Sequence, residues 1–162
     1  MKKLFIIILI LILNASCKNK DFFRDELGVN IKLGDELFSA KEKKSIGEVN
    51  FYIDDYSILN KNENLYKLKY PKREYETSFG WKTIEWNEDS IFNNTKILKV
   101  ISNYDYSEED TKKEVLNMIN ILTSETNPVT YSYKSVNGII EGFQLHLIDT
   151  KNSKFYMFEF YD

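Results

Sequence analysis

The sequence predicts an α+β domain in which an antiparallel, meander-rich β-sheet packs against one main α-helix. Short aromatic and β-branched segments separated by polar turns recur along the chain, which is typical of strands. Residues 107–124 show most clearly the three-to-four apolar spacing of an amphipathic helix. Asn137-Gly138, between two apolar residues, is the strongest short signal for a β-hairpin.

The first half of the domain, about residues 28–86, is expected to contain one helix and several strands. Residues 35–44 (DELFSAKEKK) are rich in helix formers and predict the helix. Aromatic and β-branched residues predict strands over 48–53, 65–70 and 79–86.

The main helix is expected to follow a further strand at residues 96–101 (KILKVI). Ser107 is suited to cap this helix, and the acidic residues after it favour the positive end of the helix dipole. The predicted apolar face contains Val115, Leu116, Met118, Ile119 and Leu122. The helix is expected to end near Ser124.

The last third of the chain is expected to be a β-meander. Apolar and polar residues alternate over 129–134 and 143–147, on either side of the Asn137-Gly138 turn. Residues 155–161 are apolar on both faces, which predicts a strand inside the sheet. The order strand, helix, strands thus occurs twice, over about 28–86 and 95–161. A pseudo-duplicated unit is therefore an alternative to a single sheet with one helix.

The N-terminus has the three-part layout of a secretory signal. Two lysines are followed by the apolar run 4–13, and then by the small residues Ala15 and Ser16 directly before Cys17. A helix of that run spans about 15 Å, roughly half of a bilayer's hydrocarbon core, so it is too short for a comfortable transmembrane anchor. Cys17 is the only cysteine, which excludes a disulfide within the chain.

This segment resembles the lipobox of bacterial lipoproteins, in which a cysteine directly follows two small residues. Asn14 stands where that box usually has leucine. The resemblance implies that Cys17 carries a diacylglyceryl thioether, becomes the N-terminus on cleavage, and is often N-acylated by a fatty acid such as palmitate. It further implies a place in the cell envelope, and Lys18 favours the outer membrane. An uncleaved short anchor with an idle thiol is the alternative.

These features divide the chain into a signal peptide (1–16), a lipidated cysteine with a tether (17–26), and one globular α+β domain (27–162). The full chain has a net charge of −3, and loss of the two leader lysines makes the mature protein more acidic. An acidic surface argues against nucleic acid as a partner, because phosphates require a basic face.

No catalytic or metal-binding set is recognisable, and no cofactor is expected. One cysteine and one histidine, His146, cannot form a Cys/His zinc site within one chain. No Gly-x-Ser-x-Gly turn accompanies the histidine, which is expected to face away from the apolar side chains of 143–147. Asp54 and Asp55 come at the end of the strand predicted over 48–53, and adjacent residues of a strand point to opposite faces, so the two cannot easily share one ligand. The domain is therefore expected to be non-enzymatic.

Trp81 and Trp86 are the candidate binding residues, together with Tyr70 and Tyr75. The spacing of the two tryptophans places them on opposite faces of a regular strand, so one is expected in the core and the other outside. Exposed Trp and Tyr suit protein hot spots and sugar stacking, although a β-rich core also uses aromatic residues. Asp89-Ser90-Ile91 matches a short O-glycosylation pattern.

We therefore expect a membrane-anchored envelope lipoprotein that binds a protein partner, either as an immunity-type inhibitor or as an adaptor. The alternative is a lipoprotein that binds a glycan or small ligand through exposed aromatic residues. A hydrolase built on carboxylates alone is a third class, and it requires two acids from separate segments to meet in one cleft.

Overall fold

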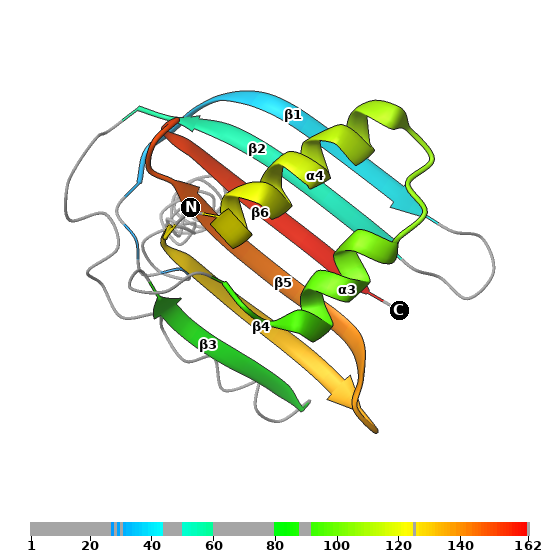
Figure 1. Ribbon diagram of the computed structural model, residues 1–162. Helices are drawn as coiled ribbons and strands as arrows, with labels where there is room; N and C mark the ends of the chain where they lie inside the picture. The colour runs from blue at the N-terminus through cyan, green and yellow to red at the C-terminus, as the bar shows by residue number, and fades with distance from the viewer. Residues whose placement is uncertain are drawn as a thin grey trace, which may run out of the picture.

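The computed structural model describes residues 27, 29, 31–43, 50–59, 80–87, 92–124 and 126–161. Within these residues the chain forms a two-layer α+β fold, in which two helices cover one face of a six-stranded antiparallel sheet (Figure 1). The elements in chain order are β1 (Leu33–Lys43), β2 (Asn50–Ile58), β3 (Trp81–Asn87), α3 (Thr95–Asn103), α4 (Glu109–Ser124), β4 (Val129–Val136), β5 (Ile139–Asp149) and β6 (Lys154–Tyr161). The expected α+β class with an antiparallel sheet is confirmed.

The C-terminal strand β6 lies inside the sheet, as predicted. The strand order is β1-β2-β6-β5-β4-β3, so β6 is hydrogen-bonded to β2 on one side and to β5 on the other. Tyr156 and Phe158 pack toward the helices, whereas Phe155 and Met157 pack on the opposite face. Burial on both faces explains why this segment is almost continuously apolar.

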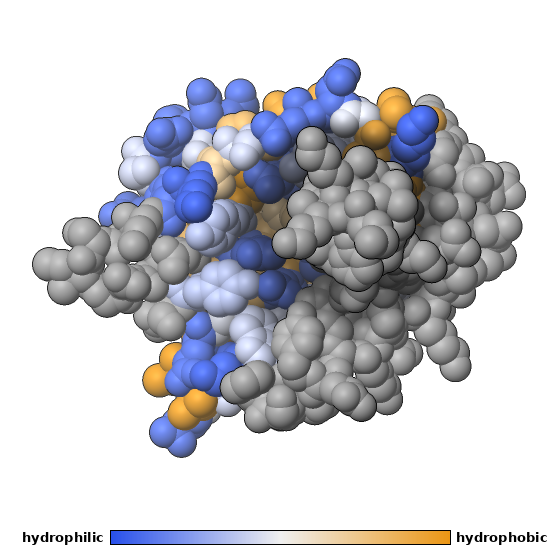
Figure 2. Space-filling view, turned by 180° about the vertical axis from the view of Figure 1, so that it is seen from behind, coloured by the Kyte–Doolittle hydropathy of each residue, from blue (hydrophilic) through white to orange (hydrophobic). Residues whose placement is uncertain are grey.

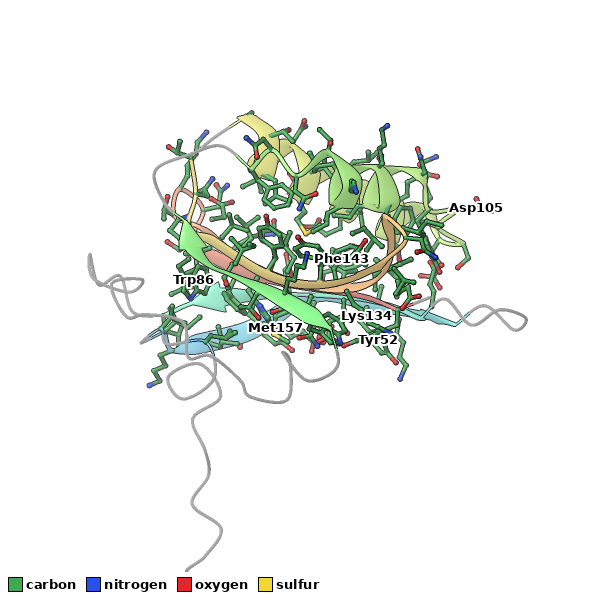
Figure 3. All side chains as sticks on the ribbon, turned by 90° about the horizontal axis from the view of Figure 1, so that it is seen from below. Tyr52, Trp86, Asp105, Lys134, Phe143 and Met157 are labelled. Carbon is green, nitrogen blue, oxygen red and sulfur yellow. The ribbon has the colours of Figure 1, made fainter. Side chains whose placement is uncertain are left out.

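The main core lies between the sheet and the helices. Strands β2, β5 and β6 turn every second side chain toward α3 and α4. Phe143 lies in this layer (Figure 3), and its ring stacks on Phe158 at a centroid distance of 5.3 Å. The strands contribute the fully buried side chains Phe51, Ile53, Phe143, Leu145, Leu147, Tyr156 and Phe158, and the helices contribute Ile97, Ile101, Val115, Met118 and Leu122.

A smaller core lies on the opposite face, near the end of the sheet where β5 turns into β6. Leu27 and Ile31 are buried there in one cluster with Ile148 and Phe155. The indole Nε1 of Trp86 donates a hydrogen bond to the Leu27 carbonyl oxygen at 2.7 Å. These contacts hold the first described residues against this end of the sheet.

The β4–β5 hairpin confirms the prediction from the Asn-Gly pair. Asn137 and Gly138 have φ angles of 52° and 83°. Positive φ at both positions is what a type I′ turn requires. At the other end of β5, the buried Asp149 carboxylate accepts hydrogen bonds from the backbone N–H and the side-chain amide of Asn152, which closes the turn into β6.

Helix α4 confirms the main helix predicted over residues 107–124, with a later start. The Lys112 N–H donates to the Glu108 carbonyl oxygen, so Glu108 and not Ser107 occupies the cap position. The Ser107 N–H instead donates to the Glu42 carboxylate on β1. Val115, Met118 and Leu122 are buried as predicted, whereas Leu116 is exposed.

The helix predicted over residues 35–44 is wrong, because this segment belongs to β1. The helix propensity of these residues is only a weak local preference. Hydrogen bonding to β2 from Glu36 through Lys43 outweighs it. Strand β1 is at the edge of the sheet, where charged side chains such as those of Lys41 and Glu42 are readily tolerated.

The strand predicted over residues 96–101 is also wrong, because these residues belong to α3. The Oδ1 atom of Asn94 accepts a hydrogen bond from the Ile97 N–H at 3.2 Å and caps the helix. Ile97 and Ile101, which are buried, lie on one helix face because they are four residues apart.

Among the described residues two helices cover the sheet, so the expected single main helix is not confirmed. The predicted strands 48–53 and 79–86 correspond to β2 and β3, whereas 65–70 lies outside the described residues. The described part of residues 28–86 contains no helix, so the pseudo-duplicated arrangement is not confirmed.

Candidate functional site: the open face of the sheet

Where Figure 2 shows the sheet face opposite the helices, its side chains are mainly hydrophilic. Strand register places Tyr52 beside Glu159, and Glu159 beside Gln144. Figure 3 shows Tyr52 on the side of the sheet away from Phe143. We call this surface the open face, and its residues are Lys41, Tyr52, Trp81, Thr83, Lys134, Gln144, Glu159 and Tyr161.

Gln144, Glu159 and Tyr161 form a hydrogen-bonded network on the open face. Gln144 Nε2 donates to the Tyr161 hydroxyl at 2.6 Å, and this hydroxyl donates to Glu159 Oε2 at 3.3 Å. Gln144 Nε2 also lies 3.4 Å from Glu159 Oε1. Burial, followed by the Glu159 charge, raises the pKa of Tyr161 to about 12. The hydroxyl therefore stays protonated at neutral pH and holds the amide and the carboxylate in place.

Aromatic rings flank this network. The Trp81 ring meets the Tyr161 ring edge-on at a centroid distance of 6.2 Å. The Lys41 ammonium lies 4.8 Å from the centroid of the Tyr52 ring, a cation–π contact. The Trp81 ring lies against Gly142 on β5, where an added Cβ atom would be 3.4 Å from the indole and 3.2 Å from the Phe160 carbonyl oxygen.

Trp81 and Trp86 lie on the same face of the sheet, contrary to the prediction from their spacing. A register shift between Ile84 and Asn87 inserts an extra residue into β3. Such a bulge reverses the side-chain alternation beyond it. Trp86 consequently packs in the smaller core, where it bonds to Leu27. Trp86 therefore has a structural role, whereas the half-buried Trp81 remains a candidate binding residue.

His146 faces away from the apolar side chains of 143–147, as predicted, but it is not a surface residue. It lies between Thr130 and Met157 in the sheet and is 3% exposed. Its ring centroid is 6.1 Å from that of Phe155. The histidine is therefore buried on the same side of the sheet as the open face, next to Phe155 and Met157 of the smaller core.

The remaining predicted site residues lie outside the described part of the chain. They are Cys17, Tyr70, Tyr75 and the segment Asp89-Ser90-Ile91. Among the residues that are described, no group of three or more His, Cys, Asp or Glu side chains is arranged to hold a metal ion. In that same part of the chain, no helix is long and apolar enough to cross a bilayer.

A buried ionic cluster lies on the helix side of the sheet, and sequence patterns did not predict it. Asp55 on β2 is 1% exposed, and its Oδ2 atom accepts a hydrogen bond from Lys154 Nζ at 2.8 Å. Lys154 Nζ also lies 3.7 Å from Glu114 Oε1 on α4. The Tyr156 hydroxyl donates to the same Glu114 oxygen at 3.2 Å, and Asn117 Nδ2 donates to the Tyr156 hydroxyl at 3.3 Å.

Burial determines the direction of the pKa shift at Asp55 but not at Lys154. Burial raises the pKa of Asp55 above its ordinary value of 3.8, although the Lys154 ammonium acts in the opposite direction. Burial also lowers the pKa of Lys154, but the hydrogen bond and the charge of Asp55 outweigh it and raise this pKa overall. Burial has the weaker effect on Lys154 because its side chain is 27% exposed and keeps part of its hydration, whereas that of Asp55 is 1% exposed. Asp55 is enclosed between sheet and helix, which favours a structural role for the cluster over an acid–base role.

No family model matches the sequence, and neither curated proteins nor solved structures provide a match. The role of the open face is therefore inferred from its own chemistry.

Proposed function

We propose that the protein is a lipoprotein of the bacterial cell envelope, anchored in the outer membrane through acyl chains on Cys17, and that its non-enzymatic domain binds a protein partner. The short apolar leader and Ala15-Ser16-Cys17 support the anchor. Two or three acyl chains give stable attachment, because each buried methylene contributes about 0.8 kcal/mol. A membrane anchor followed by one binding domain suits both an immunity-type inhibitor and an adaptor.

The observation that carries the partner proposal is the arrangement of Trp81, Tyr161, Gln144 and Glu159. Trp and Tyr are the residues that most often dominate binding energy at protein interfaces. Here a half-buried Trp81 and Tyr161 adjoin an amide and a carboxylate that are already hydrogen-bonded in place. A partner that binds this surface therefore orders few additional side chains, which reduces the entropy lost on association.

The position of the smaller core supports the same proposal. Leu27 clusters with Ile148 on β5, whereas Trp81 lies against Gly142 on the same strand. The two positions on β5 are about 20 Å apart at the rise of an extended strand. A tether that enters the domain before Leu27 therefore joins it at the end of β5 remote from Trp81.

The anchor is tested by intact-mass analysis of the protein from its native host. We expect a mass that begins at Cys17 and includes acyl chains, and a Cys17→Ser variant that leaves the membrane fraction. A protein that retains Met1 and carries no acyl mass would contradict the anchor.

The partner is tested by site-specific photo-crosslinking in the native host. A photoreactive amino acid at Tyr52, on the open face, should crosslink one protein, and Trp81→Ala in the same chain should abolish the product. The matched control is the same photoreactive residue at Asn120, which is exposed on α4. Equal products from both positions would contradict binding at the open face.

A glycan ligand is the second candidate, because aromatic rings beside carboxylate and amide groups also suit sugar stacking and hydroxyl recognition. A Trp86→Phe variant leaves Trp81 as the reporter, and its fluorescence should change on titration with envelope oligosaccharides. Trp81→Phe, which leaves only the structural indole, is the matched control and should show no change. A Trp86→Phe variant that is silent toward every sugar would eliminate this candidate.

A further inference from the structure

A groove of about 430 Å³ lies between the edge strand β1 and the start of α4. It is lined by Ser39, Ala40, Lys41, Glu42, Ser107, Glu108 and Thr111. Figure 1 shows the N-terminal part of α4 over this side of the sheet. The volume falls in the range of sites that enclose a small ligand or several side chains.

The β1 side of the groove is the edge of the sheet formed by the described residues. In the part of the chain that the structure describes, β1 pairs only with β2 and ends the sheet. The register is irregular up to Phe38 and regular from there through Lys43. Alternate residues of an edge strand direct their N–H and C=O groups away from the sheet. The regular part of this edge coincides with the groove lining at 39–42.

Thr111 supplies a polar group without a partner on the α4 side of the groove. The residue is 0% exposed, and its Oγ1 atom has no hydrogen-bond partner among the described residues. Buried hydroxyl groups are ordinarily hydrogen-bonded. An unpaired hydroxyl in the lining of a groove therefore indicates a site that a polar group of a ligand completes.

The groove is acidic. Glu42 and Glu108 line it, and two further acidic residues occupy the first turn of α4. The Ser107 N–H lies 3.1 and 3.3 Å from the two oxygens of the Glu42 carboxylate, which positions this carboxylate at the groove. Lys41 is the one basic residue in the described lining, and its ammonium lies over Tyr52 on the open face.

We propose that an extended segment of a partner protein, carrying lysine or arginine side chains, binds in this groove as an additional strand along β1. Its backbone pairs with the β1 edge, its cations face Glu42 and Glu108, and one of its polar groups pairs with Thr111. A second copy of the chain fits poorly, because pairing β1 with β1 brings two acidic helix starts together. The groove adjoins the open face at Lys41, but the proposal does not depend on what that face binds.

The test uses the full-length protein in detergent and a short fluorescent peptide of alternating lysine and valine. Fluorescence anisotropy should show binding. One matched peptide carries glutamate in place of lysine, and another carries N-methyl groups on alternate backbone amides, which blocks strand pairing. Each change should weaken binding about tenfold or more, because strand addition requires both the main-chain hydrogen bonds and the complementary charge.

Protein variants locate the site. Glu42→Gln should weaken binding of the lysine peptide about tenfold, and the glutamine can still accept from the Ser107 N–H. Glu141→Gln on β5 removes the same charge elsewhere and should have no effect. Trp81→Ala should also leave binding of the lysine peptide unchanged, because Trp81 does not line the groove. Amide hydrogen exchange should slow at residues 39–42 when the peptide binds.

Three results would overturn the proposal. The first is a lysine peptide that does not bind, and the second is an N-methylated peptide that binds as well as the unmodified one. The third is a loss of binding in Glu141→Gln or Trp81→Ala as large as that in Glu42→Gln. None of these results bears on the anchor or on the open face, so the two proposals fail separately.

Discussion

Replacement of Lys154 by methionine tests the buried ionic cluster. The substitution keeps most of the side-chain volume but removes the ammonium that lies 2.8 Å from Asp55 and 3.7 Å from Glu114. Two carboxylates then remain without the cation between them, and one of them is 1% exposed. We expect a large loss in the free energy of unfolding.

The magnitude follows from the burial of each group. Removing one partner of a buried ion pair costs about 3–5 kcal/mol, because the other charge stays buried. Lys154 is 27% exposed, so water replaces part of the lost interaction. We therefore expect the lower end of the range, about 3 kcal/mol near pH 7. Asp55→Asn removes the buried charge itself, and its amide oxygen can still accept from Lys154, so it should cost only about 1 kcal/mol through the weaker hydrogen bond.

The loss should also depend on pH. The Asp55 pKa is already raised by burial in the folded protein, and loss of the ammonium that lowers it raises it further. Well below 3.8 the carboxyl is protonated in both the folded and the unfolded chain, so no buried charge opposes folding. As pH rises above that value, the unfolded chain loses its proton first, and the free energy of unfolding falls. The Lys154→Met penalty should therefore be smallest in acid.

Urea unfolding followed by tryptophan fluorescence measures these free energies. Wild type, Lys154→Met, Asp55→Asn and the double variant are compared at about pH 4 and at about pH 7. The double variant should recover most of the stability that Lys154→Met loses, because no charge is then left buried. A Lys154→Met protein as stable as Asp55→Asn near pH 7, or an equal loss at both pH values, would refute the reasoning.

Five further variants test the core, the cap and the roles of the two tryptophans, each by the same urea titration. Phe143→Ala should lower the free energy of unfolding by about 4 kcal/mol, because the ring is fully buried and leaves a cavity; a loss below about 2 kcal/mol would contradict its central place. Asn94→Ala should cost about 1 kcal/mol through loss of the α3 cap, whereas Asn94→Asp should retain most of it. Trp86→Phe should cost about 2 kcal/mol, because it leaves the Leu27 carbonyl oxygen without its donor. Trp81→Ala should cost only about 1 kcal/mol as a half-buried residue at the sheet surface, and the reverse order would contradict the assigned roles.

Sequence patterns predicted the elements whose signal is local. The apolar spacing of α4 and the positive-φ pair Asn137-Gly138 directly reflect the local backbone that these residues adopt. Strand β1 was missed because its formation depends on pairing with β2, which no short-range preference encodes. Helix α3 was missed because a short apolar run of this length is ambiguous between strand and helix. The spacing of Ile97 and Ile101, together with Asn94, is the signal that distinguishes the two.

The candidate site was predicted only in part, for the same reason. Trp81 and Trp86 were both named as binding candidates and were expected on opposite faces, but the face of Trp86 depends on a bulge that forms only when β3 pairs with β4. Asp55 and Lys154 are 99 residues apart, so only the pairing of β2 with β6 brings them together. Contacts of this kind require the tertiary fold and leave no pattern within a short window.

The proposal that the open face binds a partner accounts for the polar composition of this face. Among the described residues, most of the large buried side chains lie on the helix side of the sheet, and the apolar cluster on the opposite face lies around Leu27. A partly exposed network of Gln144, Glu159 and Tyr161 contributes little to stability, because each hydrogen bond replaces one made to water. An interface partner removes that water, and the same fixed donors and acceptors then distinguish one ligand from another. We therefore expect these hydrogen bonds to contribute more to the free energy of binding than to the free energy of folding.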